Sequence, residues 1–160
     1  MSKRKSKNNA LDLVLNLVTI ALCVFVIIGI FVSGVGFGLS SDLAANYSIL
    51  NLFNIDVAGY NLSSTASVLT ALFGLFAGIC ALVIAILAVL KLFGVKLKYG
   101  RILTIIFGIL VALFAILTFL MLPIDKGFDA LGKTMFFRVG MWFTFIPGIL
   151  LLPVTLFCKK

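Results

Sequence analysis

Four long stretches without a charged side chain constrain this chain more than any other feature. Asp, Glu, Lys and Arg are all absent from residues 13–41, 57–90, 102–124 and 139–158. A helix needs about 20 predominantly apolar residues to cross a bilayer, and each stretch reaches that length. The sequence therefore predicts an all-α integral membrane protein, a four-helix transmembrane bundle. We place its four spans at residues 11–32, 66–90, 101–122 and 136–158.

The segments outside the spans give the domain organisation. A polar basic tail covers residues 1–9, and residues 10–160 form a single four-span membrane domain. Its outer loops are residues 33–65 and 123–135, and its inner loop is residues 91–100. The chain is 63% hydrophobic and only 11% charged, which is too little charge to solvate the surface of a globular domain.

The basic residues cluster beside the spans. Of the thirteen Lys and Arg residues, four precede the first span, four lie between the second and third, and two follow the fourth. The other three are Lys126, Lys133 and Arg138. Because cytoplasmic flanks carry the excess of Lys and Arg, we expect a multi-pass protein of the plasma (cytoplasmic) membrane, bacterial in source, with both termini cytoplasmic. The net charge of +8 then reflects contact with the lipid bilayer, and no nucleic acid is expected as a partner.

The first outer loop is predicted to contain a short β-hairpin. Apolar residues partly alternate along residues 47–56, Ala58-Gly59 offers a turn, and residues 60–63 return as a second strand. The apolar residues of this hairpin need cover, which a partner protein would supply. The candidate partner surface comprises Ile49, Phe53, Ile55, Val57 and Tyr60.

The remaining extramembrane segments are predicted without strands. The glycine-rich run over residues 33–38 is interpreted as a helix terminator or flexible exit, because each glycine weakens a helix. In residues 124–137 the apolar Phe128, Leu131 and Met135 recur at helical spacing between charges. This pattern predicts a short interfacial amphipathic helix.

Small residues recur along one face of the second span with spacings of four and three. This seam includes a Gly-x-x-x-Gly pattern, and small residues let membrane helices approach closely. Two interpretations remain open: packing against the first or third span of the same chain, or contact with a second copy. The helix-packing seam comprises Ser67, Ala71, Gly74, Gly78, Ala81, Ala85 and Ala88.

The fourth span carries Pro147 and Gly148 near its middle. Proline lacks the N–H of a regular helix and clashes with the preceding turn. The pair predicts a helix kink at this point.

The residue inventory restricts the chemistry. The chain has no His, and its five acidic residues are all Asp. Histidine-based nucleophilic sites cannot be assembled within one chain, and zinc sites need clustered His and Cys. The spans also lack the central ionisable residue that proton-coupled transporters use. We therefore predict that the protein is not an enzyme, with no catalytic, cofactor-binding or metal-binding residues and no cofactors.

These features predict a small, non-enzymatic tetraspan protein that acts through protein–protein interaction, as an accessory subunit, scaffold or self-protection protein. Its partner would be a membrane or extracellular protein, or a second copy in a homo-oligomer. The alternative is an oligomeric channel, or a carrier for a lipid or apolar solute.

In topology the chain resembles the claudin and tetraspanin type of four-span protein, with inner termini and a larger first outer loop. Claudins carry a Trp and paired Cys in that loop, and tetraspanins a Cys-Cys-Gly in the second. Here the single Trp is Trp142, and the three cysteines are Cys23, Cys80 and Cys158. The resemblance therefore implies a claudin-like topology and assigns no residue a role.

Overall fold

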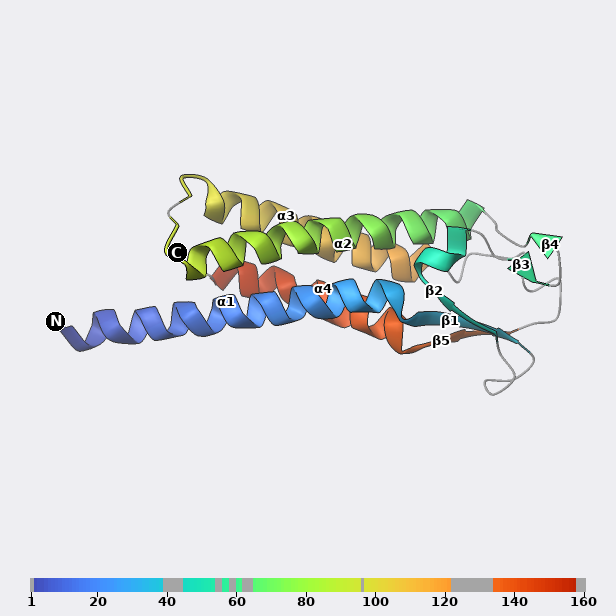
Figure 1. Ribbon diagram of the computed structural model, residues 1–160, viewed down its shortest axis with the longest axis horizontal. Coiled ribbons are helices and arrows are strands. Elements are labelled where there is room, and N and C mark those ends of the chain that lie inside the picture. Colours follow the sequence, from blue (N-terminus) through green and yellow to red (C-terminus); the bar gives the residue numbers. More distant parts are fainter. Residues whose placement is uncertain are drawn as a thin grey trace.

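The computed structural model describes residues 2–38, 45–53, 56–57, 60–61, 65–95, 97–121 and 134–157. Within these residues the chain forms four long helices and a set of short strands gathered at one end (Figure 1). The helices are α1 (Ser2–Phe31), α2 (Thr65–Leu92), α3 (Gly100–Met121) and α4 (Val139–Phe157). The short elements are β1 (Ser33–Gly38), β2 (Ala45–Ser48), the 3₁₀ helix η1 (Leu50–Phe53), β3 (Asp56–Val57), β4 (Tyr60–Asn61) and β5 (Thr134–Phe137).

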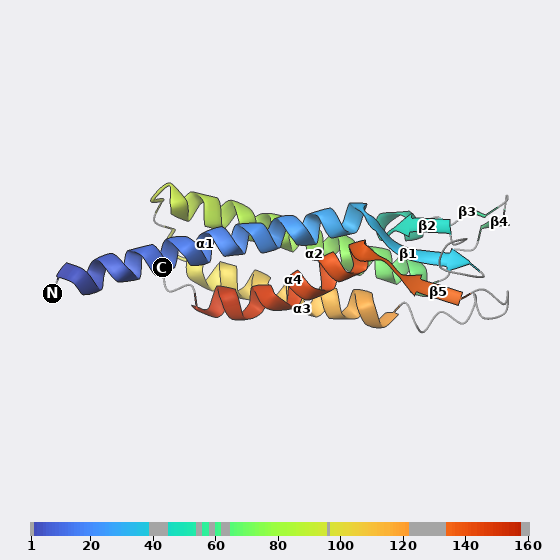
Figure 2. The same ribbon diagram turned by 90° about the horizontal axis from the view of Figure 1, so that it is seen from below.

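The four helices pack as a ring in which each touches two neighbours. Helix α1 packs against α2 and α4, and α3 packs against the same two helices from the other side. Figures 1 and 2 show consecutive helices running in opposite directions, with the start of α1 and the end of α4 at the same end. We call this end, which carries Lys91, Lys98 and Arg101, the basic end, and the opposite end the sheet end.

All four helices are long and apolar enough to cross a membrane. The candidate spans are Ala10–Phe31, Ser67–Leu92, Gly100–Met121 and Val139–Phe157. Only 33–39% of each span is buried inside the bundle, and the outward faces carry large apolar side chains such as Phe76, Ile109 and Ile146. Such an apolar exterior suits lipid rather than water. The chain is thus a multi-pass membrane protein built as a four-helix bundle.

The interior of the bundle is formed by small and medium residues. A central cluster joins all four helices, with Cys23 and Val26 from α1, Val111 from α3 and Leu151 from α4; α2 adds Cys80, Ala81 and Ile84. Cys23, Val26, Val111 and Leu151 are fully buried. Their close packing supplies the dispersion contacts that hold membrane helices together.

Short strands extend from the helix ends at the sheet end. Strand β1 follows α1 directly and pairs antiparallel with β2 on one side and β5 on the other, giving the order β2-β1-β5. A second, two-stranded pairing joins β3 and β4, with Asp56 opposite Asn61 and Val57 opposite Tyr60. Because β1 follows α1 and β5 leads into α4, the three-stranded sheet joins the segment after α1 to the segment before α4, beside the α1–α4 contact.

Several predicted features differ from this arrangement. Residues 33–38, interpreted as a flexible exit, form strand β1, and residues 134–137 form β5 where a helix was predicted. The fourth span begins at Val139 rather than at residue 136. Pairing with β1 explains both changes, because it bonds the backbone groups of residues 134–137 across strands.

The first helix also begins earlier than the predicted span, which was placed at residues 11–32. Helix α1 starts at Ser2, so that its backbone continues into the predicted tail. Extending an existing helix avoids the cost of nucleation. The remaining residues of the predicted interfacial helix, including Phe128 and Leu131, lie outside the described residues.

Candidate functional site

Ile49 lies between β2 and η1 and anchors this part of the chain, which we call the outer segment, in the bundle at the sheet end. Its side chain is fully buried in a cluster with Ile30, Leu52 and Met141. A Cβ added at Gly74 of α2 would lie 2.5 Å from the Ile49 Cγ2 atom. A Cβ added at Gly34 would lie 2.9 Å from Ile49 Cγ1. The two glycines therefore leave the space that Ile49 fills.

The 3₁₀ helix η1 determines which neighbouring side chains face inwards. The Leu52 N–H donates to the Ile49 carbonyl at 3.3 Å, and the Asn51 N–H donates to Ser48 Oγ at 3.2 Å. Leu52 is buried beside Ile49, whereas Phe53 remains 38% exposed. Residues three apart lie on one side of a 3₁₀ helix, so Ile49 and Leu52 point into the bundle and Phe53 remains at the surface.

The five residues of the predicted partner surface therefore lie in different environments. Ile49 belongs to the buried core and not to the surface where the prediction placed it. Phe53 is exposed. Val57 and Tyr60 lie opposite each other in the β3–β4 pairing, and Ile55 lies outside the described residues.

Hydrogen bonds fix the start of α4 against β1. The Arg138 N–H donates to the Gly34 carbonyl at 2.8 Å, and the Met141 N–H donates to the Arg138 carbonyl at 3.1 Å. The β1–β2 register shifts between Ser33 and Val35, which places Gly34 at a bulge. Bulges bend and twist a strand, and here the bulge lies where β1 leaves helix α1.

Helices α1 and α4 come into backbone contact beside this bulge. A Cβ at Gly140 of α4 would lie 2.5 Å from the Val32 carbonyl oxygen and 2.8 Å from that of Gly29. A Cβ at Gly29 would lie 2.5 Å from the Thr144 Oγ1 atom. Glycine at both positions permits the close approach that membrane helices use in place of hydrophobic burial.

The small-residue seam of α2 faces into the bundle. Six of its seven members are buried and Ala85 is half-buried. Gly74 meets Ile49, and Gly78 meets the Ile30 side chain of α1. These two contacts lie within one chain, so the seam provides the space for packing of α1 and the outer segment.

Buried hydroxyl groups in the spans bond to their own helices. Thr19, Thr118 and Thr144 each donate to the carbonyl oxygen four residues earlier, at 2.7–3.1 Å. Thr155 of α4 donates to the Leu152 carbonyl at 2.9 Å. A threonine bonded in this way adds no unsatisfied polar group to the core. These threonines therefore do not form a polar path between the helices.

Pro147 and Gly148 lie inside α4, which continues through both residues to Phe157. Both are buried, and a Cβ at Gly148 would lie 2.7 Å from the Ala115 Cβ of α3. The pair therefore lies at the α3–α4 contact. The kink predicted at this position stays a prediction.

Possible metal ligands are scattered in the described part of the chain. No cluster of three or more His, Cys, Asp or Glu residues occurs there. Cys23 and Cys80 are buried free thiols.

The chain matches no family model, no curated protein and no solved structure. Its function must therefore be inferred from its own geometry.

Neither the three-stranded sheet nor the anchoring role of Ile49 was predicted from the sequence. One signal for β1 was present, because Gly34, Gly36 and Gly38 alternate with Val35 and Phe37. Alternation with period two is typical of a strand. The pairing of β1 with β5, about one hundred residues later, had no local signal.

Proposed function

We propose that this protein is a non-enzymatic membrane protein that works by binding another protein at its sheet end, as an accessory subunit, scaffold or self-protection protein. The observation that carries the proposal is the anchoring of the outer segment by Ile49. A segment that is held by a buried side chain presents its neighbours, such as Phe53, in a defined position. Binding surfaces that are preorganised in this way lose less free energy on association.

The packed interior argues against a solute pathway through a single chain, whereas the alternative of an oligomeric channel would place the pathway between chains. The central cluster lies between the helices, and Thr19, Thr118 and Thr144 bond to carbonyl groups of their own helices. A pore or solute pathway through one chain would need a polar or open route. The proposal therefore assigns the contact surface to the sheet end and gives the helices the role of a rigid support.

The proposal places the protein in the cytoplasmic membrane of a bacterium, with the basic end inside. In the sequence, ten of the thirteen Lys and Arg residues precede the first span, lie between the second and third spans or follow the fourth, as expected for cytoplasmic flanks. The partner is then a membrane or extracellular protein, or a second copy of this chain. The claudin-like topology remains a resemblance in outline and carries no part of this proposal.

The test is purification of the full chain in mild detergent, with the mass measured by light scattering corrected for bound lipid and detergent. The proposal expects a complex of fixed stoichiometry, either with a different protein or with further copies of the 17.3 kDa chain. Phe53→Ala should weaken the complex about ten-fold, in the range of truncating an aromatic contact residue. The control Ile109→Ala alters an exposed side chain on α3 and should have no effect. A lone chain in every preparation would refute the proposal.

A further inference from the structure

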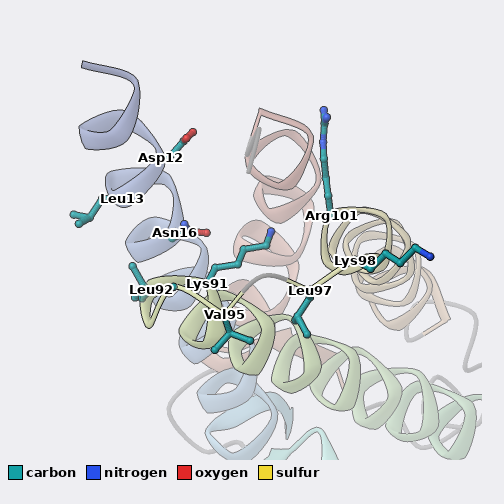
Figure 3. Close-up of a pocket in the computed structure, with 10 residues that line it drawn as sticks. Asp12, Leu13, Asn16, Lys91, Leu92, Val95, Leu97, Lys98 and Arg101 are labelled. Carbon is teal, nitrogen blue, oxygen red and sulfur yellow. The ribbon is translucent and has the colours of Figure 1, made fainter. Parts of the chain in front are cut away.

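The basic end of the bundle contains a pocket that the proposed function does not use. Its volume is about 610 Å³, and it opens between the start of α1, the end of α2 and the start of α3 (Figure 3). The lining residues are Asp12, Leu13, Asn16, Lys91, Leu92, Gly94, Val95, Leu97, Lys98 and Arg101. From this geometry we infer a binding site for the phosphate group of an anionic phospholipid.

The charge of the lining favours an anion. Lys91 and Arg101 contribute two positive charges, and Asp12 contributes the one negative charge among the lining residues. Lys98 also lines the pocket, but its side chain points away from the gap (Figure 3), with its Nζ 5.4 Å from the centre of the Tyr99 ring. Figure 3 shows Asp12 and Lys91 directed towards the gap between the helices, while Arg101 extends towards the open end. Arginine can bind a phosphate through two parallel N–H bonds, and lysine acts as a compact point charge.

Lys91 is held in place by the first turn of α3. Its Nζ donates to Thr104 Oγ1 at 3.5 Å, and Thr104 Oγ1 donates in turn to the Gly100 carbonyl at 2.7 Å. Thr104 is buried, and Lys91 is half-buried. The ammonium group is therefore positioned at the pocket before any ligand arrives, which lowers the entropy cost of binding.

The tight end of α2 shapes the floor of the pocket. The Gly94 N–H donates to the Lys91 carbonyl and the Val95 N–H to the Leu90 carbonyl, both at 3.0 Å. This is the Schellman arrangement, which requires a left-handed residue after the helix, and Gly94 has φ of 77°. The turn brings Val95 and Leu97 back towards the helix ends.

The apolar part of the lining distinguishes a lipid from a soluble phosphate. Four lining side chains remain exposed, from 39% for Leu92 to 51% for Leu13, with Val95 and Leu97 between them. A soluble anion would leave these side chains uncovered, whereas the acyl chain of a phospholipid would cover them.

The position of the pocket matches the headgroup layer. The candidate spans begin at Ala10 and Gly100 and end at Leu92 on this side of the bundle, so the pocket lies at the boundary of the apolar region. Basic pockets between helices at this level are suited to phosphorylated headgroups. The inference concerns the end opposite the proposed contact surface and does not depend on the proposed function.

The test is titration of dioleoyl phosphatidylglycerol against the purified full chain, followed by native mass spectrometry. Zwitterionic dioleoyl phosphatidylcholine is the reference lipid. We expect one tightly bound phosphatidylglycerol, held at least about ten-fold more tightly than phosphatidylcholine, because the choline cation of phosphatidylcholine offsets the charge of its phosphate and is repelled by the basic lining. Equal binding of the two lipids would overturn the inference.

A matched pair of variants separates the pocket from general surface charge. Lys91→Gln with Arg101→Gln removes two charges from the pocket, and the control Lys3→Gln with Lys5→Gln removes the same charge from the amino-terminal segment. We expect about a ten-fold loss of phosphatidylglycerol affinity in the first variant and less than about three-fold in the control. Equal losses would assign the binding to diffuse attraction and refute a built site.

A third variant keeps the inference testable if the double substitution impairs folding. Asp12→Asn removes the lining carboxylate, so phosphatidylglycerol affinity should rise about three-fold or more because a like-charge repulsion is lost. An unchanged or lower affinity would contradict the assignment.

Competition with inorganic phosphate at a large excess then distinguishes a lipid headgroup from a soluble phosphate. Weak competition supports a lipid, and complete displacement would overturn the lipid assignment in favour of a soluble phosphate.

Discussion

At the scale of single residues, glycines decide how closely the parts of this molecule approach one another. Gly140 of α4 lies against the backbone of α1, whereas Gly78 of α2 meets only the far end of the Ile30 side chain. A backbone oxygen cannot rotate away from an added methyl group, but an isoleucine side chain can change its rotamer. Although both glycines lie in α-helices, Gly78 should therefore tolerate replacement by alanine better than Gly140.

Gly140→Ala should destabilise the bundle by about 1–3 kcal/mol, as overpacking in a close-packed interior does. Gly78→Ala is the matched control and should cost less, because Ile30 can move and alanine favours a helix over glycine. Thermal unfolding of the two variants in the same detergent, followed by size-exclusion chromatography, measures the difference. Equal stability of both variants would show that α1 and α4 are not in backbone contact at Gly140.

The side chain of Ile49 makes a second prediction at this scale. Ile49→Ala should lower the free energy of unfolding by about 2–5 kcal/mol, because truncation leaves a cavity between Gly34 and Gly74. Phe53→Ala, four residues away at a partly exposed position, should cost only about 1 kcal/mol. The same thermal assay compares the two. A greater loss in Phe53→Ala would contradict the inward orientation of Ile49.

At the scale of secondary-structure elements, the sheet end depends on the pairing of β1 with β5. In the β1–β5 register Phe37 lies opposite Met135, and Val35 lies opposite Phe137. The pairing joins two segments that are far apart in the sequence and lead from α1 and into α4. It therefore fixes where both outer segments leave the membrane.

Cysteine cross-linking tests that register. Residues directly opposite in an antiparallel pair have Cα atoms about 4.5–5.5 Å apart, within the span of about 4.4–6.8 Å that a disulfide bridges. In a background whose native cysteines are replaced by alanine, Phe37→Cys with Met135→Cys should form a disulfide on mild oxidation. The control Phe37→Cys with Phe137→Cys is diagonal, at about 7–8 Å, and should cross-link more slowly. Faster reaction of the control would show that the register is wrong.

The helices could be predicted from the sequence, whereas the sheet could not. Each span can be recognised from a local property, the absence of charged residues over about 20 positions. The β1–β5 pairing lies beside the hydrogen bond from the Arg138 N–H to the Gly34 carbonyl, and it joins residues about one hundred positions apart in the sequence. Local reading of Met135 with its apolar neighbours favoured a helix, and tertiary pairing overrode that preference.

The orientation of Ile49 was mispredicted for a similar reason. Strand alternation placed Ile49 and Phe53 on one face, but residues 50–53 form a 3₁₀ helix. A 3₁₀ helix groups residues three apart, so Ile49 and Leu52 share the buried side. The small-residue seam was recognised from its spacing because the helix period is local, but its partners, Ile30 and Ile49, became evident only in the folded chain.

At the scale of the whole molecule, a closed bundle carries two different ends. The central cluster occupies the interior, the sheet end presents an anchored outer layer, and the basic end holds a cationic pocket. This arrangement suits a protein that fixes two contacts on opposite sides of a membrane.

Proteoliposomes should therefore be electrically silent and impermeable to small solutes when each contains single chains. The physical reason is that, among the described residues, packed apolar side chains around Ile84 and Leu151 occupy the middle of the bundle. Conductance recordings and dye-release assays measure this directly, with protein-free liposomes as the reference. Stepwise currents that scale with protein content would instead favour the oligomeric channel.

Site-specific photo-cross-linking in intact membranes tests the central claim most directly. A photoreactive phenylalanine analogue at Phe53 lies on the proposed contact surface, and the same analogue at Ile109 lies on the lipid-facing side of α3. The account predicts one protein adduct of defined mass from position 53, formed with a different protein or a second copy, and lipid adducts from position 109. If position 53 yields no protein adduct while the chain is folded and abundant, the sheet end is not a binding surface and the account is contradicted.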